Sequence, residues 1–84
     1  MLIKNEDIKE VVAEIPAGHR HMRMTIRLQD GQELTFLEAS IANIVRAYIT
    51  VKTHPVKAQI RLVGRKIERV KDGYAEWQLI ETDY

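Results

Sequence analysis

The stretch TFLEASIANIVRAYITVKTHP, residues 35–55, determines the fold that we expect for this chain. Its apolar residues recur three and four positions apart, which is the spacing of one face of a helix. These residues are Leu37, Ile41, Ile44, Val45, Tyr48 and Ile49. Thr35 followed by Glu38 predicts a capping box at the start of the helix. Pro55 cannot continue a helix, so we expect one amphipathic helix in the middle of the chain.

A strand and a hairpin are predicted before this helix. Residues 19–29 alternate between apolar and polar side chains, which is typical of a half-buried strand. The Asp-Gly pair at 30–31 is a hairpin signal, and a three-residue loop with Gly31 in the left-handed conformation keeps one face of the hairpin apolar. That loop predicts two apolar cross-strand pairs, Met24 with Phe36 and Ile26 with Leu34.

Further strands are predicted after the helix. Residues 56–63 alternate in the same way, and the alternation breaks at Gly64, where we expect a bulge or a corner. Strand character resumes at residues 67–70. The Asp-Gly pair at 72–73 predicts a second hairpin turn, and residues 74–82 form the last strand.

The N-terminal segment fits two structures. Ile8, Val11, Val12 and Ile15 follow the spacing of a short helix, and Asn5 would suit its N-cap. Alternate residues of the same segment are also apolar, as in a strand. We expect a helix over residues 5–15 and keep the strand as the alternative.

Together these elements predict a single small α+β domain that covers residues 1–84. An antiparallel sheet of about four to five strands, in the order ββαββ, packs its apolar face on the central helix as a two-layer sandwich. A short N-terminal helix precedes the first strand in the preferred version. The expected core comprises Met22, Met24, Ile26, Leu28, Leu34, Phe36, Ile41, Ile44, Val45, Tyr48, Ile60, Leu62, Trp77 and Leu79.

Composition narrows the class of protein. The 84 residues contain no cysteine, which excludes a disulfide scaffold, a thiolate zinc site and cysteine catalysis. No apolar run reaches the length of about 20 residues that a membrane-spanning helix needs. The apolar part of the N-terminus is too short for a secretion signal, so we expect a cytoplasmic protein that does not enter a membrane.

A basic sheet face is the first candidate site. Five side chains are predicted to share the polar face of the sheet, where they could bind a polyanion such as nucleic acid. They are His21, Arg23, Arg27, Lys57 and Arg61. The alternative is a solvated face on which acidic residues lie across from the arginines. The formal net charge of only +1 favours this alternative.

Signals for catalysis and for metal binding are weak. His19 and His21 lie two apart and would supply two of the ligands of a metal site, but the sequence places no third ligand beside them. Ser40 is the single serine, and no phosphate-binding loop or nucleophile elbow is present. We therefore predict neither an enzyme nor a cofactor or metal site.

An apolar surface is the last candidate site. Four apolar residues near the C-terminus have no place in the expected core, namely Val63, Val70, Tyr74 and Ile80. Exposed apolar patches on small domains commonly bind partners. We expect a non-enzymatic binding domain whose partner is another protein or a second copy of itself. The alternative is an accessory domain that binds nucleic acid through the basic face.

Overall fold

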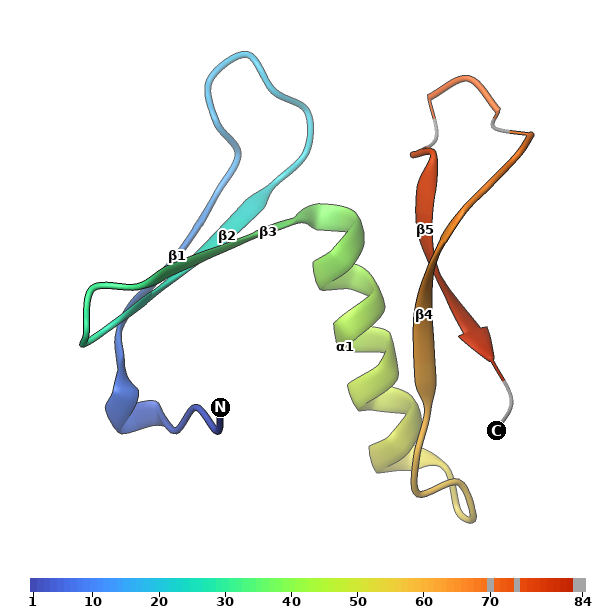
Figure 1. Cartoon of the computed structure of the whole chain (residues 1–84), viewed down its shortest axis with the longest axis horizontal. Coiled ribbons are helices and arrows are strands. Elements are labelled where there is room, and N and C mark those ends of the chain that lie inside the picture. The colour runs from blue at the N-terminus through green and yellow to red at the C-terminus, as the bar shows by residue number, and fades with distance from the viewer. Residues whose placement is uncertain (70, 74, 83–84) are drawn as a thin grey trace. The chain divides into compact units, whose positions relative to one another are not determined.

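The computed structural model describes residues 1–69, 71–73 and 75–82. Within these residues it contains five strands in two antiparallel sheets and one α-helix, so the mixed α+β content is confirmed (Figure 1). The chain divides into two compact units, Met1–Ala42 and Asn43–Tyr84. Each unit is described by itself.

The first unit is built around a three-stranded antiparallel sheet in the order β1-β2-β3. One turn of 3-10 helix, η1 (Asn5–Asp7), leads into β1 (Ile8–Glu14). The next two strands are β2 (Arg23–Leu28) and β3 (Glu33–Leu37). The central position of β2 gives both of its edges a hydrogen-bonded neighbour.

The helix expected over residues 5–15 is wrong, because its main part is strand β1. Val11 lies opposite Ile26 and Ala13 lies opposite Met24 across the β1–β2 pairing. Pairing with β2 provides partners for the backbone N–H and C=O groups and places Val11 and Ala13 on the apolar face of the sheet, whereas Val12 lies opposite Thr25 on the other face. Helical spacing over so short a stretch is overridden by this pairing.

The β2–β3 hairpin has the predicted register. The loop has three residues, and Gly31 within it has a φ of 93°, the left-handed conformation that glycine adopts readily. The Gly31 N–H donates to the carbonyl of Leu28 at 3.0 Å and closes the turn. The predicted apolar pairs are confirmed, Met24 with Phe36 and Ile26 with Leu34.

Helix α1 (Glu38–Thr53) begins later than the sequence pattern suggests. Thr35 belongs to β3, and its hydroxyl is hydrogen-bonded to the Thr25 hydroxyl at 3.0 Å. The carboxylate of Glu38 is bonded to the imidazole of His21. The predicted capping box is therefore wrong, because both of its side chains are bonded to β2 or to the segment before it.

The end of α1 is close to the predicted stop. The Thr53 hydroxyl donates to the carbonyl of Ile49 at 2.7 Å. His54 Nδ1 accepts hydrogen bonds from the backbone N–H groups of Val56 at 3.1 Å and Lys57 at 2.8 Å. These bonds turn the chain away from the helix axis at the proline that follows His54.

The second unit joins most of α1 to a hairpin of β4 (Arg61–Lys66) and β5 (Trp77–Thr82). The pairing is continuous, and Gly64 lies opposite Leu79 without a shift of register. The bulge or corner expected at Gly64 is therefore wrong. Strand structure begins at Arg61 rather than at residue 56.

The connection between β4 and β5 differs in part from its prediction. Residues 67–69 are not strand, although strand character was expected there. The turn at 72–73 is confirmed, with Gly73 at a φ of 85°. The other expected strand positions at this turn, Val70 and Tyr74, lie outside the described residues.

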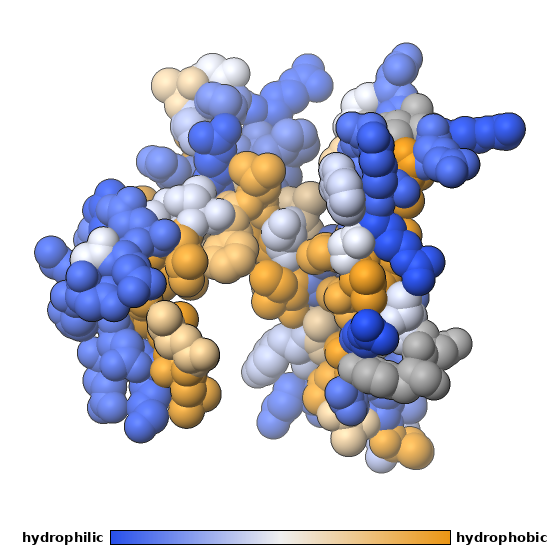
Figure 2. Space-filling model, viewed as in Figure 1, coloured by the Kyte–Doolittle hydropathy of each residue, from blue (hydrophilic) through white to orange (hydrophobic). Residues whose placement is uncertain are grey.

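The buried core of the described residues is small. Leu28, at 4% exposure, is the one buried apolar side chain among them. Several side chains that the sequence pattern assigns to a core are exposed instead, and this part of the core prediction is wrong: Leu34, Ile44, Val45, Tyr48 and Trp77. Apolar side chains accordingly appear at the surface in Figure 2.

Candidate functional site

The predicted basic face is divided between the two units. His21, Arg23 and Arg27 belong to the first unit, and Lys57 and Arg61 belong to the second. Arg23 and Arg27 lie on β2, four residues apart, so both project from its polar face. The structure thus brings Arg23 and Arg27 together, whereas His21 lies before the strand.

Arg27 lies between two carboxylates on the polar face of the first sheet. Its Nε donates to Glu33 Oε1 on β3 at 2.8 Å, and its Nη1 donates to Glu10 Oε1 on β1. The hydrogen bond with Glu10, followed by that with Glu33, raises the pKa of the Arg27 guanidinium above its ordinary value. The three side chains form an ion-pair row across all three strands, and their formal charges sum to −1.

Two other residues of the predicted basic face also have acidic partners. His21 Nδ1 is 2.6 Å from Glu38 Oε2. Lys57 Nζ donates to Glu81 Oε1, and this hydrogen bond is the main reason that the pKa of the Glu81 carboxyl lies below its ordinary value. These pairings are those of the solvated face that the sequence offers as the alternative to a polyanion site.

The structure brings together two of the four residues of the predicted apolar surface. Val63 on β4 lies directly opposite Ile80 on β5, and both are half-buried. Val70 and Tyr74 lie outside the described residues. The neighbours two positions away on the same hairpin face are polar, so Val63 and Ile80 form an apolar pair with a hydrophilic rim: Arg61, Arg65, Gln78 and Thr82.

Helix α1 carries a larger exposed apolar stripe, of which Ile44, Val45 and Tyr48 were expected in the core. Its exposed members are Ile44, Val45, Tyr48 and Ile49. Asn43, Ala47 and Thr50 lie on a different side of the helix and are half-buried. Helical spacing could identify the stripe but could not show whether another element covers it.

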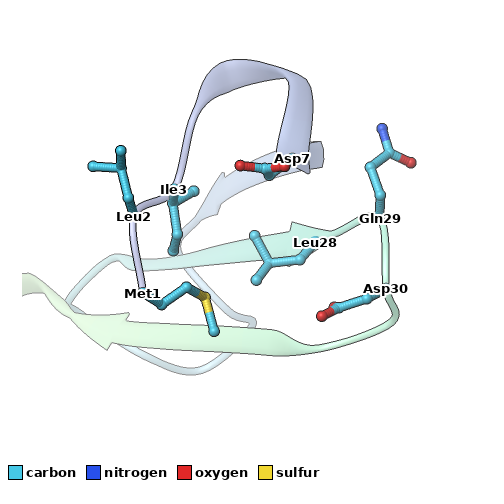
Figure 3. Close-up of a pocket in the computed structure, with 7 residues that line it drawn as sticks. All are labelled: Met1, Leu2, Ile3, Asp7, Leu28, Gln29 and Asp30. Atoms are coloured by element: carbon cyan, nitrogen blue, oxygen red, sulfur yellow. The ribbon is translucent and has the colours of Figure 1, made fainter.

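A shallow hollow in the first unit was not predicted (Figure 3). It has a volume of about 320 Å³. Its lining residues come from the N-terminal segment and the β2–β3 turn, namely Met1, Leu2, Ile3, Asp7, Leu28, Gln29 and Asp30. Asp7 accepts a hydrogen bond from the Lys4 N–H and Asp30 accepts one from the Gln32 N–H, both at 2.9 Å. The two carboxylates therefore serve local turns.

In the described part of the chain, no three His, Asp or Glu side chains come close enough together to hold a metal ion. The structure has no helix, over the residues it describes, with the length and apolar character to cross a bilayer. The pairing of His21 with Glu38 gives this histidine a local partner.

Comparison of the chain with protein-family models, with curated proteins and with solved structures found no match in any of the three.

Proposed function

We propose that this chain is a binding domain without catalytic activity, and that it acts through contact with another protein, first of all a second copy of itself. The observation that carries the proposal is the imbalance between buried and exposed apolar side chains. Leu28 is the one buried apolar residue of the described chain, whereas larger side chains such as Tyr48 and Trp77 are about two-thirds exposed. Association supplies small domains with the apolar burial that their own cores lack.

The distribution of the exposed apolar side chains supports the same proposal. Part of them gathers on two surfaces: Val11, Ala13 and Leu34 lie on one face of the β1–β2–β3 sheet, and the exposed residues of α1 form one stripe. The half-buried side chains of Met24, Ile26 and Phe36 complete this sheet face. An apolar face of a sheet and an apolar stripe of a helix each need a second layer.

The finer architecture belongs to the proposal as well. We infer a two-layer α+β sandwich in which the stripe of α1 covers an apolar sheet face, either within one chain or between two copies. Ile44→Ala would then lower the free energy of unfolding by about 2–5 kcal/mol, as for a packed side chain. Lys52→Ala, on the same helix, is the control. A change within about 0.5 kcal/mol for Ile44→Ala, as at an exposed site, would contradict the sandwich.

The proposed association is tested with charge substitutions on the second unit. Val63→Asp and Ile80→Asp are expected to lower the mass measured by light scattering from that of a dimer to that of one chain, because each places a carboxylate in the apolar pair. Arg61→Glu is the matched control on the same strand and should leave the mass unchanged. Circular dichroism of each variant confirms that it is folded. An unchanged dimer in both aspartate variants would exclude the Val63–Ile80 pair from the interface.

A further inference from the structure

The β4–β5 hairpin is a two-stranded ribbon. Over the residues that the structure describes, β5 pairs with β4 on one edge and with no strand on the other. An isolated two-stranded ribbon is marginally stable in water, and a third strand adds backbone hydrogen bonds and side-chain contacts. The outer edge of β5 is therefore a place where another strand can add.

One hydrogen bond fixes which backbone groups of β5 lie on this outer edge. The Ile67 N–H donates to the Glu76 carbonyl at 2.8 Å, in the same register as the β4–β5 pairing. In an antiparallel pair each residue directs its N–H and its C=O to the same side, and successive residues alternate. Every second residue after Glu76 therefore bonds to β4, namely Gln78, Ile80 and Thr82. The intervening residues direct N–H and C=O outward, namely Trp77, Leu79 and Glu81.

This edge lacks the protective features that are found at the edges formed by β1 and β4. Strand β5 contains no Lys, Arg or Pro, and its pairing with β4 has no bulge. By contrast, β1 has a register shift beside Lys9, and β4 carries the cations Arg61, Arg65 and Lys66. Edge strands that must stay unpaired are commonly blunted by such bulges and charges. The one charged residue of β5, Glu81, is bonded to Lys57.

We propose that two copies of the chain pair through their β5 strands, antiparallel and around a twofold axis at Leu79. This inference rests on the proposed function, because it specifies how self-association occurs. Leu79 then faces Leu79 of the second copy, and Trp77 faces Glu81 of the second copy. The three outward N–H groups of each strand bond the outward carbonyls of the other. The product is a four-stranded sheet in the order β4-β5-β5-β4.

Charge and symmetry both favour this pairing over the other edge pairings of the β4–β5 hairpin. A β4–β4 contact would bring the three cations of one strand beside the same three cations of a second copy, and like charges on paired strands are destabilising. A β5–β4 contact joins two different edges. The resulting dimer still has one free β4 edge and one free β5 edge, so further copies add to it and form an open filament. The β5–β5 contact is self-complementary, closes as a dimer and keeps the basic strands at its outside.

Side-chain burial favours it as well. Trp77 is 64% exposed and shares one face of the hairpin with Leu79, two residues away. Around a twofold axis at Leu79, the two Trp77 side chains flank the central leucine pair. Aromatic residues at the centre of an interface contribute strongly to binding, because they remove a large apolar area from water.

The decisive test is amide hydrogen exchange measured by NMR at a concentration where light scattering shows a dimer. The backbone amides of Trp77, Leu79 and Glu81 are expected to exchange as slowly as the amides of the neighbouring residues that bond to β4. Their exchange rates should be about tenfold or more below the rate of an amide without a hydrogen bond. Dilution to the monomer should accelerate these three amides selectively. Fast exchange at all three in a proven dimer would overturn the β5 pairing while leaving self-association intact. A single-chain mass at every concentration would overturn both.

A cross-linking experiment gives a second readout. Because the chain has no cysteine, Leu79→Cys introduces a single thiol at the proposed axis. Equivalent Cα atoms of a directly opposed pair lie about 5.5 Å apart, so a short bis-maleimide is expected to join two copies. Arg65→Cys on β4 is the control, because its two copies would lie on the outer strands. Covalent dimer in the Arg65→Cys variant but not in the Leu79→Cys variant would contradict the proposed pairing.

Discussion

Gly64 lies directly opposite Leu79 in the β4–β5 hairpin, and a Cβ atom added to Gly64 would lie 3.9 Å from Leu79 Cδ2. That distance is ordinary van der Waals contact. The glycine therefore serves neither a bulge nor a close approach of two backbones, and the two strands pair without interruption around it. Gly31, by contrast, has a φ of 93°, a backbone conformation that favours glycine.

The two glycines should respond differently to alanine. Gly64→Ala is expected to raise the free energy of unfolding by about 0.4–1 kcal/mol, because alanine restricts the unfolded chain and fits the strand. Gly31→Ala should lower it by about 1 kcal/mol, because a side chain is strained in the left-handed conformation. Urea denaturation of the two variants measures both values. Equal effects of the two substitutions would contradict the turn and the uninterrupted hairpin.

The first unit depends on its one buried side chain. Leu28→Ala is expected to lower the free energy of unfolding by about 2–5 kcal/mol, because the surrounding side chains cannot fill the resulting cavity. The matched control is Leu34→Ala on the neighbouring strand, which should cost less because Leu34 is 38% exposed. Thermal or urea unfolding ranks the two variants. A larger loss at Leu34 than at Leu28 would place the core elsewhere.

The ion pair between Lys57 and Glu81 predicts a pH dependence. The pKa of Glu81 is lowered in the folded protein, chiefly by the hydrogen bond from Lys57, with a smaller contribution from Arg46. The pair therefore contributes stability above the ordinary carboxyl pKa, and this contribution is lost as the pH falls through the lowered value. Lys57→Met should raise the pKa of Glu81 more than Arg46→Met does. NMR titration of the Glu81 carboxyl carbon measures both shifts, and the reverse order would contradict the pairing.

Pairing of the basic side chains predicts weak binding to nucleic acid. Arg27 is held between Glu10 and Glu33, and His21 is bonded to Glu38, so both basic side chains already have acidic partners. Titration into labelled single- and double-stranded nucleic acid at about 50 and 200 mM salt should show no steep dependence of affinity on salt. A loss on the order of a hundredfold in affinity, abolished by Arg23→Glu, would instead establish a polyanion site.

Strong local signals in the sequence predicted the β2–β3 hairpin correctly. The Asp-Gly pair and the alternating residues on both sides permit one register that keeps a face apolar, so the pair of Met24 and Phe36 could be inferred before the structure. The turn at 72–73 and the end of α1 could also be predicted from the sequence, because glycine and proline determine the backbone conformation locally.

Features that depend on residues far apart in the sequence could not be predicted. Strand β1 exists because β2 lies beside it, and the spacing of Val11 and Val12 is equally compatible with a helix. The sequence pattern placed Glu38 in a capping box, because a single sequence does not show that His21 Nδ1 lies 2.6 Å from Glu38 Oε2. The exposure of Tyr48 could not be inferred either, because periodicity identifies an apolar face and does not identify what covers it.

Sedimentation velocity of the unmodified protein across a wide concentration range decides whether this chain associates with a second copy of itself. We expect a species with twice the mass of one chain, which dissociates to the single chain on dilution. A species with the mass of one chain at every concentration, including the highest, would show that the chain does not self-associate.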